Sequence, residues 1–394
     1  MPTLQFLYNL LGEMGKLLMF FKQLSYLVSV ILLLGFLLLN SGAAIAHTPH
    51  DDVTQLELSP NYDRDRTVFI LVRGNLLKSQ DGGESWRQLE KGLDNHNSLY
   101  QTSSSLAISP SSPDILYLSA PGDGVYGSSD GGESWSKIDR GLDTRDISLL
   151  SVAPNSPEFV LASAKEKGLY RTQNGGKLWQ KIIGDRKITA IAYLPGKAGN
   201  YQIVVGDDKG RFYLSQDGGN SWKQQYQLNN TGRIRKIAIS PNFSVDKTIV
   251  IGTKKAGIFK STDSGKSFKE INQGILDESI MSIAFSPNYE KDNTLFAASF
   301  REGVFRSNDG GKTWKQYNKG LGRNPQADEF KLPHFTNVIT SPKFSDDQTI
   351  FLSAFSGLFK STDGGFNWQE MVTLPRSEEH TSELQSQFRI SYAV

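Results

Sequence analysis

The stretch Ser307-Asn308-Asp309-Gly310-Gly311-Lys312-Thr313-Trp314 decides the fold, because its pattern recurs along nearly the whole chain. The pattern is Ser/Thr-x-Asp/Asn-x-Gly-x-x-aromatic, and successive copies lie 43 to 54 residues apart. The six further copies are Ser79–Trp86, Ser128–Trp135, Thr172–Trp179, Ser215–Trp222, Ser261–Phe268 and Ser361–Trp368. Seven copies at this spacing predict one repeat architecture rather than several independent domains.

The chemistry of the motif is that of a tight turn between two strands. The acid or Asn in the third position can accept hydrogen bonds from backbone N–H groups of its own loop, and Gly in the fifth position permits a positive φ. The final aromatic residue can then enter the next strand and pack into the core. The acids and Asn are Asp81, Asp130, Asn174, Asp217, Asp263, Asp309 and Asp363, and the aromatic residues are Trp86, Trp135, Trp179, Trp222, Phe268, Trp314 and Trp368.

The residues between the turns repeat as well. Each unit has an apolar strand, a turn such as Ser240-Pro241-Asn242, a β-branched strand such as Thr248 to Ile251, and a third strand that runs into the motif. In the turn, Pro presets φ, and Asn and Asp are expected to cap the loop. The fourth strand starts at the aromatic residue and often ends in Gly-Leu or Gly-Ile, as at Gly274-Ile275. Four short strands in each of seven units predict an all-β fold, a seven-bladed β-propeller of four-stranded antiparallel blades, over residues 47–375.

The repeated turn resembles the Asp-box, also called the bacterial neuraminidase repeat. This resemblance implies that the turns lie on the outer rim and serve the fold rather than catalysis. Among Asp-box proteins the chain is most similar to the exported photosystem II stability and assembly factors, and more distantly to sialidases, xyloglucan-degrading glycosidases and sortilin-type domains. The first of these resemblances implies a lumenal propeller that holds a membrane-protein assembly intermediate on an arginine-rich face.

The composition restricts the function classes. The chain has 43 Lys and Arg against 41 Asp and Glu, so its bulk charge does not indicate a nucleic-acid partner. It has no cysteine, which excludes disulfides, thiolate metal sites and a thiol nucleophile. No phosphate loop, zinc pattern or calcium loop is present, so we expect no metal and no cofactor. We also expect a monomeric protein.

Both ends of the chain are expected to differ from the propeller. Residues 1–46 have the pattern of a signal peptide, in which Lys16 and Lys22 precede an apolar run at residues 24–39 and Ala44-Ile45-Ala46 follows. An uncleaved membrane anchor is the alternative, and both predict export to a periplasm, a thylakoid lumen or the extracellular space. Residues 376–394 break the repeat abruptly and resemble the translation of a sequencing adapter, so we expect a non-native tail there.

The candidate binding residues lie in loops that a propeller brings to the face opposite the repeated turns. Basic residues are prominent there in the middle of the chain: Arg186, Lys187, Arg233, Arg235, Lys254, Lys255 and Arg301. Arginine binds carboxylates in two-pronged fashion, so these residues favour a protein partner. A solvated surface of mixed charge is the alternative, because acids such as Asp208 and Asp277 lie in the same loops.

Two function classes remain. One is a non-catalytic scaffold that binds a protein partner such as a membrane-protein assembly intermediate. The other is a sialidase-like or other glycoside hydrolase, or a carbohydrate-binding propeller. The Arg-Ile-Pro element that sialidases carry ahead of the first Asp-box is absent, and no catalytic residues are assigned. The sequence therefore favours the scaffold.

Overall fold

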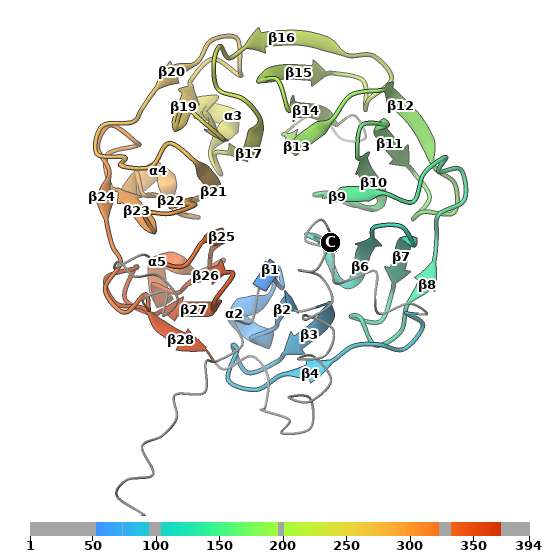
Figure 1. Cartoon of the computed structure of the whole chain (residues 1–394), viewed down its shortest axis with the longest axis horizontal. Helices are drawn as coiled ribbons and strands as arrows, with labels where there is room; N and C mark the ends of the chain where they lie inside the picture. The colour runs from blue at the N-terminus through green and yellow to red at the C-terminus, as the bar shows by residue number, and fades with distance from the viewer. Residues whose placement is uncertain (1–52, 73, 94–103, 196–200, 323–331, 372–394) are drawn as a thin grey trace, which may run out of the picture. The chain divides into compact units, whose positions relative to one another are not determined.

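The repeats form the blades of a seven-bladed β-propeller (Figure 1). The computed structural model describes residues 53–72, 74–93, 104–195, 201–322 and 332–371. The expected signal segment and the expected non-native tail lie outside these residues. Each described blade is a four-stranded antiparallel sheet whose strands pair in chain order. The predicted fold class is therefore confirmed.

The strands of blades 1 to 4 have the following bounds: β1 (Val53–Leu58), β2 (Val68–Val72), β3 (Asn75–Ser79), β4 (Arg87–Gln88); β5 (Ser105–Ser109), β6 (Ser112–Ala120), β7 (Gly124–Ser128), β8 (Ser136–Lys137); β9 (Ile147–Ala153), β10 (Ser156–Ala164), β11 (Gly168–Thr172), β12 (Gln180–Gly184); β13 (Ile188–Leu194), β14 (Gln202–Asp207), β15 (Arg211–Ser215) and β16 (Lys223–Gln227).

Blades 5 to 7 comprise β17 (Ile234–Ile239), β18 (Ile249–Thr253), β19 (Ile258–Ser261), β20 (Lys269–Glu270); β21 (Ile280–Phe285), β22 (Leu295–Ser299), β23 (Val304–Ser307), β24 (Lys315–Gln316); β25 (Phe335–Thr340), β26 (Ile350–Ala354), β27 (Gly357–Ser361) and β28 (Gln369–Met371). The first strand of each blade faces the centre of the ring and the fourth lies at its periphery (Figure 1).

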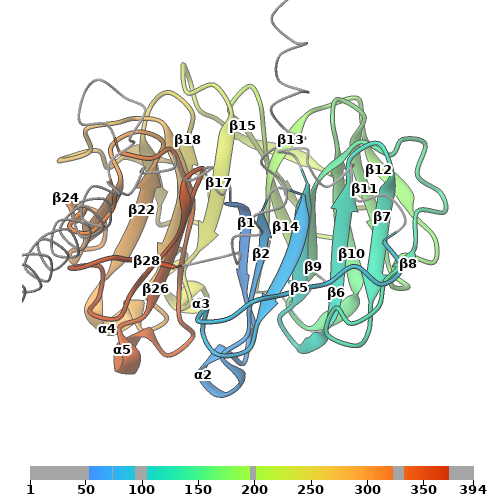
Figure 2. The same cartoon turned by 60° about the horizontal axis from the view of Figure 1, so that its bottom comes forward.

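Four of the turns between the first and second strands contain one turn of helix. These are α2 (Tyr62–Asp65), α3 (Phe243–Asp246), α4 (Tyr289–Asp292) and α5 (Phe344–Asp347), which lie at one end of the ring (Figure 2). In the described ranges no helix is long and apolar enough to cross a membrane.

The expected capping of these turns by Asn is wrong. Asn61 makes no side-chain capping bond at α2. Instead, the Ser59 hydroxyl accepts from the Asn61 N–H at 3.1 Å and donates to Asp65 at 2.6 Å, and Asp65 accepts from the Thr67 N–H at 2.8 Å. A Ser–Asp pair therefore closes the turn, because the short Ser side chain reaches both the backbone and the carboxylate.

The repeated turn makes the bonds that its chemistry predicts. In blade 6 Asp309 accepts from the Ser307 hydroxyl at 2.7 Å, from the Thr313 N–H at 2.9 Å and from the Thr313 hydroxyl at 2.6 Å. In blade 3 the amide oxygen of Asn174 accepts from the Thr172 hydroxyl at 2.9 Å in the same way. Most of the aromatic residues are buried, but Trp86 and Trp222 are only half-buried.

Neighbouring blades are joined by a cation that the sequence did not single out. The residue just before the turn's hydroxyl residue is basic in five blades, and its side chain donates to a carbonyl in the turn of the next blade. The five bonds are Lys78 to Gly131, Arg171 to Gly218, Lys260 to Gly310, Arg306 to Gly364 and Lys360 to Gly82, at 2.7 to 2.9 Å. These residues therefore contribute to the seams between blades.

The ring closes between blade 7 and blade 1 through side chains, since every described blade is a continuous piece of chain. Thr336 donates to the Val53 carbonyl at 3.1 Å and Asn337 donates to the Leu56 carbonyl at 3.2 Å. Lys343 pairs with Asp63 at 2.9 Å on the helical side of the same seam. This seam therefore uses the same kinds of contact as the others.

Asp309→Ala is expected to lower the free energy of unfolding by about 1–2 kcal/mol at neutral pH, because it leaves the donors of the turn without their acceptor. Burial acts to raise the pKa of Asp309, but bonds from Thr313 and Ser307 outweigh it and lower the pKa to about 2. The contribution is thus present above the unfolded pKa of about 4 and is lost as pH falls toward 2.

Chemical denaturation of wild type and Asp309→Ala between pH 7 and pH 2 measures this difference. Asp309→Asn is the matched control, since Asn174 shows that an amide oxygen fits the turn. A gap between wild type and the Ala variant that stayed constant down to pH 2 would contradict the assignment.

Candidate interaction surface

All seven predicted basic residues lie on one face of the ring. The repeated turns share the other face with the one-turn helices, as shown by the bond from the Gly82 N–H to the Arg66 carbonyl at 2.9 Å. The links between blades and the turns between second and third strands lie opposite. We call the seven residues there the basic arc: Arg186, Lys187, Arg233, Arg235, Lys254, Lys255 and Arg301.

The arc begins in the link between β12 and β13. The Arg186 guanidinium lies over the ring of Tyr213, 5.1 Å from its centroid. The Lys187 carbonyl accepts from the Asp208 N–H at 3.1 Å, which joins the link to the β14–β15 turn. Within that turn the fully buried Asp207 accepts from the Arg211 side chain at 2.5 Å and from two backbone N–H groups. Asp207 therefore holds the loop in shape. Arg186 itself is exposed.

Blade 5 supplies the middle of the arc from two loops. The Lys254 N–H donates to the Arg233 carbonyl at 3.0 Å, and the Lys255 N–H donates to the Thr231 carbonyl at 3.1 Å. These bonds hold the β18–β19 turn against the link that precedes β17. Both lysine side chains are exposed and that of Arg233 is half-buried. Three cations from two loops are thereby brought close together.

Arg235 points along the ring because β17 has a bulge. Ile234 pairs with Thr253 and Lys236 pairs with Gly252, which leaves Arg235 as the extra residue. Its guanidinium donates to the Ser279 hydroxyl of blade 6 at 3.0 Å and contacts the sulfur of Met281. Burial and then the charge of Arg233 lower the pKa of Arg235, and Asp277 acts in the opposite direction. The bulge thus connects the middle of the arc to blade 6.

Arg301 ends the arc in the β22–β23 turn. Its N–H donates to Asp277 at 2.8 Å, and the other oxygen of that carboxylate accepts from the Ser279 N–H at 2.9 Å. Asp277 is therefore engaged by the backbone. Within the described residues no side chain of the arc forms an ion pair, whereas Lys137 and Lys181 pair with aspartates on the blades.

Apart from Arg235, whose guanidinium is engaged by blade 6, the cations of the arc are exposed or half-buried and have no carboxylate partner among the described residues. The predicted grouping rested on topology, and the structure places all seven residues as that topology requires. Their role in binding stays a prediction. The bulge at Arg235 and its contact with blade 6 could not be predicted, because neither leaves a mark in the sequence pattern.

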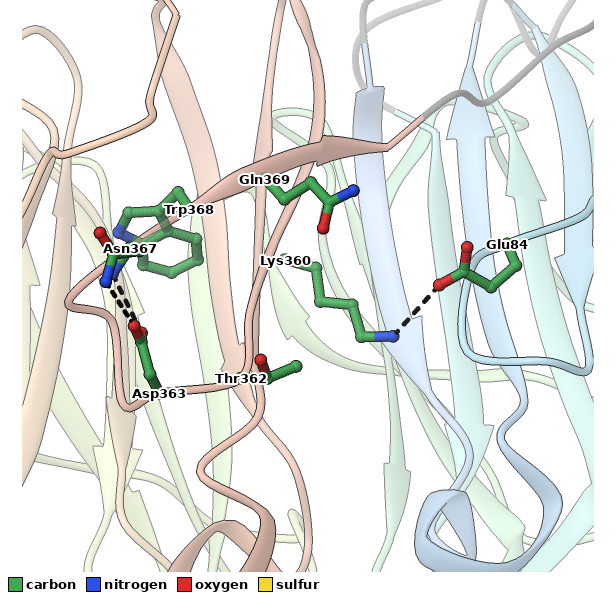
Figure 3. Close-up of a pocket in the computed structure, with 7 residues that line it drawn as sticks. All are labelled: Glu84, Lys360, Thr362, Asp363, Asn367, Trp368 and Gln369. Atoms are coloured by element: carbon green, nitrogen blue, oxygen red, sulfur yellow. Dashed lines mark hydrogen bonds and ion pairs between the residues drawn. The ribbon is translucent and has the colours of Figure 1, made fainter.

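Two further polar features of the described residues were not predicted from the sequence. Glu57 belongs to β1, the innermost strand of blade 1, and burial raises its pKa to about 7, while the charge of Lys236 acts in the opposite direction. A groove at the seam of blades 7 and 1 is lined by Glu84, Lys360, Thr362, Asp363, Asn367, Trp368 and Gln369 (Figure 3).

The polar groups of that groove are already engaged in the fold. Lys360 donates to the Gly82 carbonyl at 2.9 Å, and Asp363 accepts from Ser361 and Asn367 at 2.8 and 2.6 Å. Among the described residues no group of three or more His, Cys, Asp or Glu is arranged to hold a metal ion. The basic arc therefore stays the candidate surface.

Comparison with known proteins gives a family match. A family model described as photosynthesis system II assembly factor YCF48 matches residues 49–325. Among curated proteins none matches the chain significantly.

Several solved structures share the fold. YCF48 from Cyanidioschyzon merolae is 18% identical with a TM-score of 0.55, and the match covers 80% of this chain and 97% of that one. A structure of YCF48 bound to D1 peptide is 16% identical with a TM-score of 0.56, covering 79% and 93%. The GH74 enzyme of Niastella koreensis is 15% identical with a TM-score of 0.66, covering 82% and 55%, so the chain spans about half of that enzyme.

Proposed function

The chain belongs to the family of photosynthesis system II assembly factor YCF48, and from this premise we propose that it is an exported, non-catalytic propeller that binds a protein partner on the basic arc. The partner is a segment of a membrane-protein assembly intermediate, such as one of photosystem II. The observation that carries the proposal is the set of seven cations on one face, none of which forms an ion pair with another described residue. A family member bound to a D1 peptide supports the peptide class of ligand.

The chemistry of the arc suits such a segment. Arginine can bind a carboxylate through two parallel hydrogen bonds and can stack on peptide planes. A neutral sugar has neither a carboxylate nor a peptide plane. Cations on several loops of a rigid ring can follow an extended chain along the face. Export, by the signal segment expected at residues 1–46, would place this face where lumenal or periplasmic segments are exposed.

Reversing the charge of the arc is expected to weaken capture of a membrane complex by about tenfold or more, since four attractive contacts become repulsive. The variant carries Arg186→Glu, Arg233→Glu, Lys254→Glu and Arg301→Glu. Arg235 is left unchanged because its guanidinium is half-buried against blade 6. The measurement is quantitative pull-down from detergent-solubilised membranes at low and high salt, with the melting temperature as a check of folding.

The matched control reverses four exposed lysines on the other face, namely Lys177, Lys266, Lys291 and Lys312, and so changes the net charge equally. This control should retain the partner. Equal loss in both variants would mean that only bulk charge matters and would overturn the proposal.

A carbohydrate ligand is the second candidate, favoured by the structural likeness to the GH74 enzyme. The same arc variant tests this candidate. If a glycan array and a panel of fluorogenic glycosides show binding or turnover by the wild type that the arc variant retains, the protein acts on sugars elsewhere on the ring.

A further inference from the structure

Three aromatic side chains meet beside the end of the basic arc, and each comes from a different loop. Phe300 lies in the β22–β23 turn, His334 in the link before β25, and Phe355 in the β26–β27 turn. The imidazole of His334 stacks on Phe300 with centroids 4.2 Å apart and planes 16° apart. Phe355 meets both rings edge-on, at 6.4 Å from Phe300 and 6.3 Å from His334. We call these three residues the aromatic shelf.

The shelf is held in place by the backbone rather than by its own packing alone. The Phe335 N–H donates to the Phe300 carbonyl at 3.3 Å, and the Phe355 N–H donates to the His334 carbonyl at 2.9 Å. His334 is exposed, and the two phenylalanines are half-buried. A fixed set of partly exposed rings is a surface onto which an apolar side chain can pack.

The shelf is continuous with the arc. Phe300 precedes Arg301 directly, and its N–H donates to the Ser279 carbonyl at 2.9 Å. The hydroxyl of the same Ser279 accepts from Arg235 at 3.0 Å. One residue therefore joins the half-buried arginine of the arc to the first ring of the shelf. Phe and Arg are both enriched in protein interfaces relative to the rest of the surface.

We propose that the aromatic shelf and the end of the basic arc form one two-part site for an extended acidic peptide segment that carries an aromatic or large aliphatic side chain. This inference rests on the proposed function and adds the kind of sequence that is recognised. Carboxylates of the segment pair with Arg301 and its neighbours, and the apolar side chain packs on His334 and Phe355. The positive charge of the arc selects an acidic partner, and the rings select among acidic partners.

The test compares two dye-labelled peptides with the full chain by fluorescence anisotropy. Both consist of Glu and Ser residues, and they differ only in a central Phe or a central Ser. The wild type should bind the Phe peptide about tenfold more tightly, because only this peptide buries a ring. His334→Ala should remove most of this preference and leave the affinity for the Ser peptide unchanged. His334→Phe should restore it.

Two further variants complete the design. Phe366→Ser changes a ring of blade 7 that is 50% exposed on the turn side, and it should keep the preference. The arc variant should weaken both peptides equally. Equal binding of the two peptides by the wild type would overturn the shelf and leave the arc standing, whereas binding of neither would overturn the proposed function too. Displacement of the Phe peptide by a xyloglucan oligosaccharide would make the shelf a sugar platform and overturn the inference.

Discussion

Trp314→Ala is expected to lower the free energy of unfolding by about 3–5 kcal/mol, as large-to-small changes in a core do. Trp314 is only 3% exposed and belongs to a buried cluster at the seam of blades 5 and 6, which also includes Ile258 of blade 5 and Phe305 of blade 6. Its indole N–H donates to the Ile271 carbonyl at 2.7 Å, so the variant loses packing and leaves an acceptor of blade 5 without its donor. Guanidinium denaturation followed by circular dichroism measures the loss.

The chain contains its own comparison for this variant. Trp222 occupies the same position in blade 4, but it is half-buried and its indole N–H bonds within its own turn, to Gly219 at 3.1 Å. Trp222→Ala should therefore cost clearly less. If the two variants unfold at the same denaturant concentration, burial across the seam is not what makes Trp314 stabilising.

Gly274→Ala is expected to cost about 2–5 kcal/mol, although residue 274 is exposed, because strain and overlap both act there. Gly274 has φ of +93°, and a Cβ at this position would lie 2.1 Å from the carbonyl oxygen of Trp314. That oxygen belongs to backbone held by the bond from the Trp314 N–H to the Gln273 carbonyl at 2.9 Å, so it cannot move aside without opening the seam.

Gly322→Ala is the control, since a Cβ there meets nothing within 4 Å. It should change the free energy of unfolding by no more than about 0.5 kcal/mol. Thermal melting of the two variants and the wild type separates the cases, and a Gly274→Ala protein that melts with the wild type would show that the seam tolerates a side chain.

The architecture could be predicted because the same local chemistry recurs in all seven repeats. The turn at Asp309 uses its acid, hydroxyl and glycine as their properties require, and the alternation of apolar residues places the strands. The role of Gly-Leu and Gly-Ile pairs became clear only in three dimensions. Gly274 is a glycine because Trp314 of the next blade presses against it, and sequence order does not show that contact.

In the candidate site, too, some features could be predicted from the sequence and others could not. Topology alone assigns Arg186 and Arg301 to one face. Successive connections along the chain alternate between the two ends of a blade, so the turn between the second and third strands and the link to the next blade lie at the same end. The seam cation Lys260 looks like any surface lysine in the sequence, and only the structure shows its bond to Gly310. The meeting of Phe300, His334 and Phe355 depends on the positions of three loops, and no local pattern encodes it.

The closure of the ring by side chains has a consequence for how such proteins arise. Because each described blade is one uninterrupted segment, no strand has to cross from one blade to the other at the boundary between blades 7 and 1. A circularly permuted chain that began with another blade could therefore form the same contacts between blades. Duplication or loss of one blade-length stretch of DNA likewise adds or removes a complete module, so lineages can change the circumference of the ring without rethreading a strand.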